Sequence, residues 1–122
     1  MTFDAIRTMA LALDGVEEAT SYGTPAFKVG GALFARLRDD IGALVVRMSI
    51  QDRQELMAED PETYFITDHY LNYPYILVNL TRVQPDAMRD LLKGACKMAA
   101  GDSNARGTRQ KPRASGRKSR RP

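Results

Sequence analysis

The chain has 122 residues, 43% of them apolar, which suits one packed domain, and no run reaches the roughly 18 apolar residues of a membrane span. Its first residues lack the apolar region of a signal peptide. With Cys96 as the single cysteine and one histidine, an intrachain disulfide and a His/Cys zinc site are excluded. We therefore expect a cytoplasmic protein in which Cys96 is a buried structural thiol.

The net charge of +3 combines two regions of opposite sign. Residues 105–122 hold eight of the 18 basic residues and no acidic one, which leaves ten basic and 15 acidic residues, a net charge of −5, before them. The eight are Arg106, Arg109, Lys111, Arg113, Arg117, Lys118, Arg120 and Arg121. Such a polar segment cannot bury enough apolar surface to offset the entropy that ordering would cost. We therefore expect a domain over 1–101 and a disordered tail over 102–122. The tail attracts polyanions, or it is a solubility extension.

Helical and strand patterns alternate along the domain. Thr2 is a plausible N-cap for a first helix, whose apolar positions recur every three or four residues until Asp14-Gly15. Strands are then expected over 17–22, 26–29, 32–38 and 43–48. They are joined by turns at 23–25, 30–31 and 39–42. Gly30-Gly31 favours a type I′ hairpin, because that turn needs a positive φ at both central residues.

The second half is expected to contain a helix, two more strands and a final helix. Ser49 caps a helix that carries Ile50, Arg53, Leu56 and Met57 on one face and stops at Asp60-Pro61. Strands follow over 64–67 and 75–80, and a last helix runs from Pro85 to Gly101. Strands on short turns with helices near the ends indicate an α+β domain. Three modest helices cover one face of such a sheet and leave the other partly open.

Alternation along the strands predicts which side chains share the open face. It puts four cations there beside Phe34, namely Lys28, Arg36, Arg38 and Arg47. Cations interleaved with an aromatic ring suit a phosphate backbone with occasional base stacking. The alternative is that these polar residues only solvate an exposed sheet face, with nearby aspartates as partners.

The stretch TDHYLNYPYILVNL, residues 67–80, holds the one histidine and three of the five tyrosines. Pro74 suits the first position of a strand, and His69 is expected to hold the preceding loop by bonding a backbone carbonyl. Partner recognition by this loop is the alternative. Catalysis is not expected: no phosphate loop or nucleophile elbow occurs, and Asp68 is too close in sequence to orient His69.

Three segments together resemble the MmcQ/YjbR family of small bacterial proteins, over about residues 3–99. They are LDGVEEATSYGTPAFKVGGALFARL, ALVVRMSIQDRQELM and the stretch around His69. The residues that match its motifs are Tyr22, Gly23, Phe27, His69, Tyr73 and Pro74, with a structural or a recognition role. The resemblance implies a fold similar to frataxin and CyaY, and DNA binding through a double wing of β-hairpins. A cation that often follows the Gly-Gly pair in the family is replaced here by Ala32.

These observations favour a monomeric, non-enzymatic module that binds nucleic acid, most simply DNA, largely without regard to sequence and without a cofactor. Such a protein would lie in the cytoplasm, either free or associated with the nucleoid. A small-ligand or protein-interaction domain, with a pocket near Tyr22, Phe27, His69 and Tyr73, is the alternative. Frataxin-like iron binding would need an acidic ridge, for which Asp4, Asp14, Glu17 and Glu18 are too dispersed. An enzyme is the least favoured class.

Overall fold

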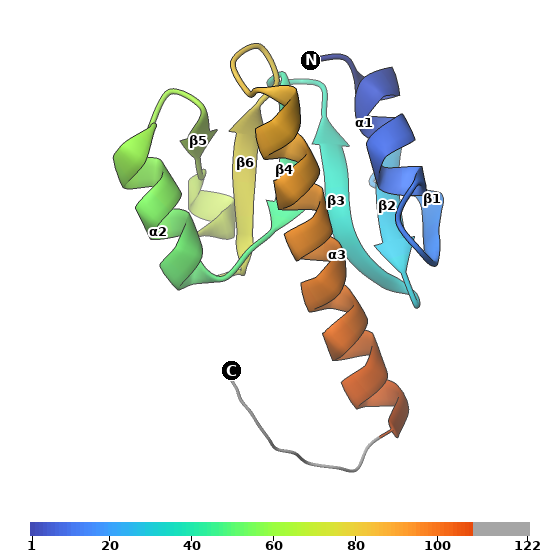
Figure 1. Ribbon diagram of the computed structural model, residues 1–122. Coiled ribbons are helices and arrows are strands. Elements are labelled where there is room, and N and C mark those ends of the chain that lie inside the picture. Colours follow the sequence, from blue (N-terminus) through green and yellow to red (C-terminus); the bar gives the residue numbers. More distant parts are fainter. Residues whose placement is uncertain (109–122) are drawn as a thin grey trace.

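The structure is a computed structural model that describes the backbone of residues 1–108 and the side chains of residues 1–101 (Figure 1). The elements in chain order are α1 (Phe3–Leu11), β1 (Val16–Ser21), β2 (Thr24–Val29), β3 (Ala32–Arg38), β4 (Ala43–Arg47), α2 (Ile50–Glu59), β5 (Tyr64–Phe65), the 3-10 helix η1 (Asp68–Tyr70), β6 (Tyr75–Asn79) and α3 (Pro85–Thr108). The predicted α+β class is confirmed. No helix in the described part of the chain is long and apolar enough to cross a membrane.

The six strands form one antiparallel sheet in the order β1-β2-β3-β4-β6-β5. Val29 pairs with Ala32, and the intervening Gly30 and Gly31 have φ values of 57° and 82°, so the predicted Gly-Gly hairpin is confirmed. The preceding turn differs from the prediction of residues 23–25. Ser21 pairs with Thr24, so Tyr22 and Gly23 form the turn, and Pro25 lies within β2.

The main core lies between the helices and one face of the sheet. Ile6 of α1 and Met88 and Leu92 of α3 are buried against apolar side chains of β2, β3, β4 and β6. Figure 1 shows α3 crossing this face over β3 and β4, with α1 beside it over β1 and β2. Cys96 is a buried free thiol of this core, as predicted, and burial raises its pKa. The opposite face of the sheet is therefore free of helices α1 and α3.

A β-bulge overturns the prediction that Phe34 lies on the open face. Phe27 pairs with Ala35 while Lys28 pairs with Leu33, so β3 has one extra residue, Phe34. A bulge shifts the alternation of the strand that contains it. Phe34 is fully buried, its ring lies 6.4 Å from that of Phe27, and both belong to the helix-covered core.

The last helix is longer than predicted. Gly101 is not among the described glycines with a positive φ, the conformation that commonly ends a helix, and α3 continues to Thr108. Gly101 as terminator is thus wrong, and helical backbone extends to Thr108 within the segment expected to be disordered. Residues 109–122, with seven of the eight basic residues of the predicted tail, lie outside the described residues. Figure 1 shows the end of α3 extending past the sheet.

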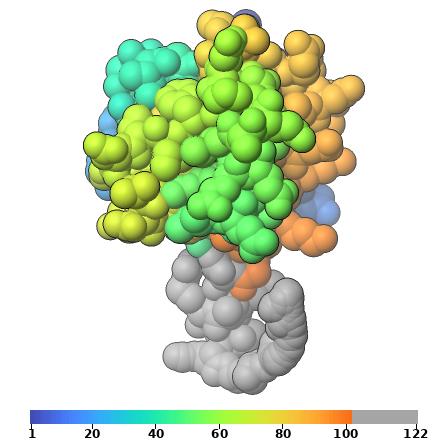
Figure 2. Space-filling model, turned by 90° about the vertical axis from the view of Figure 1, so that its left-hand side faces the viewer, coloured from blue at the N-terminus to red at the C-terminus, as the bar shows by residue number. Residues whose placement is uncertain are grey.

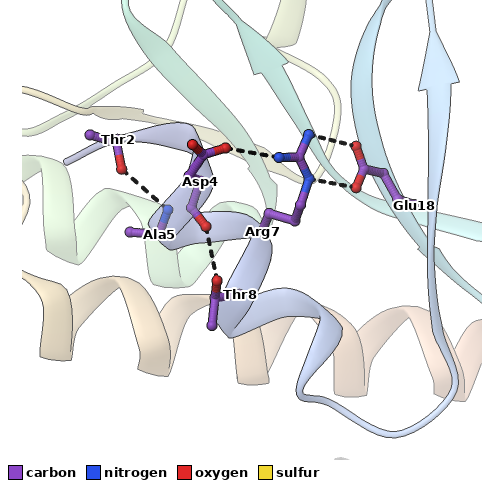
Figure 3. Close-up of polar contacts among 6 residues, drawn as sticks. All are labelled: Thr2, Asp4, Ala5, Arg7, Thr8 and Glu18. Atoms are coloured by element: carbon purple, nitrogen blue, oxygen red, sulfur yellow. Dashed lines mark hydrogen bonds and ion pairs between the residues drawn. The ribbon is translucent and has the colours of Figure 1, made fainter.

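A polar contact ties α1 to the edge strand β1 (Figure 3). Thr2 Oγ1 accepts a bond from the Ala5 amide, which confirms the predicted N-cap. One turn later, Arg7 donates to both carboxylate oxygens of Glu18 at 2.8 and 3.1 Å and to Asp4 at 2.8 Å. This arrangement lowers the pKa of Glu18, chiefly through the hydrogen bond from Arg7.

Candidate functional site

The open face of the sheet carries a second, smaller apolar cluster. It consists of Ala43 and Val45 of β4, Leu77 of β6 and Tyr70 of η1, with Phe65, Ile66 and Tyr75 packed beside it. The segment between β5 and β6 folds over this part of the face and buries Tyr70. A pocket of about 350 Å³ lies where this cluster borders β3 and the β1–β2 turn.

Aromatic rings form most of this pocket, which we call the tyrosine pocket. Its lining residues are Tyr22, Leu33, Arg36, Val45, His69, Tyr70, Tyr73 and Tyr75. They come from the β1–β2 turn, β3, β4, η1 and the start of β6, so segments distant in sequence meet there. No Asp or Glu is among them. The structure therefore brings Tyr22, His69 and Tyr73 together, whereas Phe27, expected beside them, lies fully buried in the core on the other face.

Arg36 is the cation of the tyrosine pocket. Its guanidinium lies over the ring of Tyr22, 5.2 Å from the centroid, and donates to the hydroxyls of Thr24 and Tyr70, each at 3.2 Å. By contrast, Arg7, Arg38, Arg82 and Arg89 each have a carboxylate within 3.2 Å. Within residues 1–101, no ion pair of Arg36 with a carboxylate is found, so its positive charge is directed at neutral hydroxyls and a π-face.

The other predicted cations do not line the tyrosine pocket. Arg38 binds Asp40 through two bonds of 2.9 Å, which raises the pKa of Arg38 and lowers that of Asp40. Lys28 lies across from Glu17 in the register of β1 and β2. Arg47, at the end of β4, lines a different and larger groove between α2 and α3, together with Met48, Leu56 and Leu91. Of the four predicted cations, Arg36 lines the tyrosine pocket, with Arg38 two residues away on the same strand.

Two exposed tyrosines border the pocket. The Tyr22 side chain is 90% exposed, and its backbone has a φ of 53°, the left-handed region that non-glycine residues rarely adopt. Tyr73 is 57% exposed, and its ring lies 6.4 Å from that of His69. Large rings left in solvent, one of them on a strained backbone, are features that cluster at binding sites.

Arg53 fixes the loop that carries the other wall of the pocket. This arginine of α2 is only 2% exposed and donates to the backbone carbonyls of Tyr70, Leu71, Tyr73 and Tyr75 at 2.6–2.9 Å. Figure 2 shows α2 and the segment that follows it side by side on this end of the molecule. The sequence pattern placed Arg53 on the same face of the helix as Ile50, Leu56 and Met57, but the loop-holding role was expected of His69. His69 is exposed and contacts the rings of Tyr70 and Tyr73.

Among the described side chains, no three or more His, Cys, Asp or Glu residues form a group that could hold a metal ion. Two of the four acidic residues considered for iron, Asp4 and Glu18, are ion-paired with Arg7 (Figure 3). Glu17 lies across from Lys28 in the register of β1 and β2.

Comparison with known proteins gives a family and a fold. The YjbR family model matches residues 11–97. Among solved structures, the crystal structure of Deinococcus radiodurans protein DR2400, which contains a DUF419 domain, has a TM-score of 0.67 and 20% identity. The alignment covers 84% of this chain and 88% of that one. No curated protein matches. At this identity the likeness to DR2400 concerns the fold alone.

Proposed function

The chain belongs to the YjbR family, and from that premise we propose that it is a non-enzymatic module that binds nucleic acid. The open sheet face would supply the docking site, and the basic residues after position 104 would add sequence-independent attraction. DNA is the polyanion that the family resemblance favours. The partner is then held by phosphate contacts and by stacking rather than by a base-specific code.

The observation that carries this proposal is the position of Arg36 on an aromatic surface, with no ion pair to a carboxylate of residues 1–101. A guanidinium has five donors, and here two of its bonds go to hydroxyls. Asp40 is bonded to Arg38, and Arg36 only adds a smaller electrostatic contribution to the lowered pKa of that carboxylate. Phosphate oxygens suit a guanidinium, since charge-assisted bonds are stronger than bonds to neutral acceptors. Exposed Tyr22 and Tyr73 beside it offer π-faces on which bases of any identity stack.

A binding titration with two chain lengths tests the proposal. Fluorescence anisotropy of a labelled oligonucleotide is measured at about 50 mM salt with the full chain and with residues 1–104, which retain the last core residues. Both forms are expected to bind, the full chain more tightly. If neither form binds, the proposal is wrong. Binding by the full chain alone would assign the affinity to the C-terminal segment and remove the sheet face from the site.

A second candidate function is the binding of a small ligand or a protein segment in the tyrosine pocket. Its volume of about 350 Å³ is within the range of small-molecule sites, and such sites are commonly lined by aromatic side chains, as this pocket is. A thermal-shift screen with a metabolite library separates the two candidates. Stabilisation by a metabolite, without binding of oligonucleotides, would favour the second candidate over the first.

The proposal includes three further expectations. We propose that the fold is of the frataxin and CyaY type, which is supported by α1 and α3 packing on the same face of an antiparallel sheet. We propose a cytoplasmic, nucleoid-associated location, in keeping with a nucleic-acid partner. We also propose that the protein acts as a monomer, which size-exclusion chromatography with light scattering would test.

A further inference from the structure

We propose that the tyrosine pocket accepts a single unstacked nucleotide, with its base against the exposed aromatic rings and its phosphate on Arg36. This inference rests on the proposed function and specifies it: the preferred partner is single-stranded nucleic acid or a frayed end, not an intact duplex. It follows from the composition of the pocket, the contacts of its arginine, and the way its wall is held.

The lining of the pocket defines the chemistry of its ligand. Five of the eight lining residues are Tyr or His, and Arg36 supplies the one permanent charge. A ligand cation would be repelled by Arg36, which argues against the aromatic-cage recognition of ammonium groups. A flat ring joined to an anionic group satisfies both the rings and the guanidinium. A nucleotide has this combination.

The volume of the tyrosine pocket limits how many nucleotides it can hold. A volume of about 350 Å³ is at the lower end of the roughly 300–1,000 Å³ of small-molecule sites, which suits one nucleotide. Bases inside a duplex are stacked on both sides, so a base can enter such a pocket only after leaving the stack. Leaving a duplex costs a few kcal/mol, whereas a single strand exposes its bases at little cost.

The pocket is organised before a ligand arrives. The loop carrying His69 and Tyr73 is anchored by the four carbonyl contacts of Arg53, and the buried Tyr70 connects it to Arg36 through its hydroxyl. The opposite wall of the pocket includes Tyr22, which is held by the two-residue turn between the paired strands β1 and β2. A site held this way loses little further entropy when a base binds.

The test compares single-stranded and duplex oligonucleotides of the same length and sequence. Anisotropy titrations use the full chain at about 200 mM salt, where nonspecific phosphate contacts contribute less. The single strand is expected to bind at least about tenfold more tightly than the duplex. Tyr73→Ala and Tyr22→Ala are each expected to weaken single-strand binding by about tenfold and to leave duplex binding unchanged.

Arg36→Met is compared with Arg82→Met, a matched change at a cation that lies outside the pocket and pairs with Glu62. The first should abolish the single-strand preference and the second should not. Because Tyr22 and Tyr73 are mostly exposed, the melting temperatures of their alanine variants should lie within a few degrees of that of the parent. These two variants therefore still test the proposal if Arg36→Met does not fold.

The outcomes separate this inference from the proposed function. Equal affinity for both oligonucleotides, unchanged in the tyrosine variants, overturns the inference and leaves nucleic-acid binding in place. No binding of either oligonucleotide at any salt overturns both. Binding of free dTMP at micromolar concentration, without binding of the oligonucleotides, would also overturn the inference, because the site would then serve a free mononucleotide.

Discussion

At the scale of single residues, Arg53 shows how one buried cation can organise a binding wall. Its four acceptors are all backbone carbonyls of residues 70–75, so they hold the chain in place whatever the side chains of that loop are. Carbonyl oxygens carry partial negative charge and offset the desolvation of the guanidinium collectively. The geometry of the tyrosine pocket therefore depends on a residue that does not line it.

We predict that Arg53→Met lowers the free energy of unfolding by about 3 kcal/mol, because it leaves several loop carbonyls without their charged donor. Urea unfolding followed by circular dichroism measures this change. The control is Arg89→Met, the same substitution at a half-exposed arginine paired with Asp86, which should cost less than about 1 kcal/mol. Equal losses in the two variants would contradict the anchoring role.

At the scale of elements, the β1–β2 turn combines strain with exposure. A type I′ turn favours Asn or Gly at its first central position, and here Tyr22 occupies that position with its ring in solvent. The left-handed backbone costs a non-glycine residue roughly 1–2 kcal/mol. The side chain recovers part of this cost through the stacked guanidinium of Arg36.

We predict that Tyr22→Asn raises the free energy of unfolding by about 0.5–1 kcal/mol, since Asn tolerates the left-handed region better. The same change should weaken oligonucleotide binding, so stability and binding move in opposite directions. The control is Gly23→Ala in the same turn. No atom lies within 4 Å of the added methyl group, but the φ of 79° makes that variant about 1 kcal/mol less stable. A destabilised Tyr22→Asn would contradict the strain argument.

The contact between α1 and β1 predicts a dependence of stability on pH. Arg7 lowers the pKa of Glu18 in the folded state, so this carboxylate stabilises the fold above its unfolded pKa of roughly 4.3. That contribution is lost as the pH falls through the lower, folded pKa. Glu18→Gln should therefore reduce the urea midpoint at pH 7 and have little effect at pH 2.

The matched control for this pH dependence is Glu55→Gln, at an exposed position of α2. It should leave the urea midpoint nearly unchanged at both pH values. If Glu18→Gln lowers the midpoint equally at pH 7 and pH 2, the loss has a cause other than the ionised pair with Arg7.

At the scale of the whole molecule, charge and shape are supplied by different parts of the chain. Residues 1–104 carry a net charge of −5, and residues 105–122 carry eight basic residues. The pocket on the sheet and the basic segment would thus contribute separately to affinity, one through stacking and the other through counterion release.

We predict that binding of the full chain to an oligonucleotide has a log–log salt slope on the order of −3 to −5. The slope for residues 1–104 should be close to −1, because Arg36 then provides the main phosphate contact. Titrations at four or more salt concentrations with both forms measure the difference. Identical slopes would mean that the basic segment takes no part in binding.

Local sequence signals determined the class, the family and most of the elements. Thr2 and Ser49 cap their helices through side-chain bonds to nearby amides, and Gly30-Gly31 forms its hairpin turn, because these depend on a few adjacent residues. The burial of Cys96 was expected because it is the single cysteine of the chain and has no histidine near it in sequence. A glycine was a less reliable sign of where a helix ends, since α3 continues through Gly101 to Thr108.

Only the tertiary structure decided which side chains meet on the open face. The bulge at Phe34 depends on the register between β2 and β3, and alternation along β3 alone could not reveal it. The loop carbonyls bound by Arg53 lie 17 to 22 residues away in sequence, and Arg36 meets the hydroxyl of Tyr70 across 34 residues. The sequence by itself thus named Tyr22, Arg36, His69 and Tyr73 as candidates, while long-range packing determined that they line one pocket.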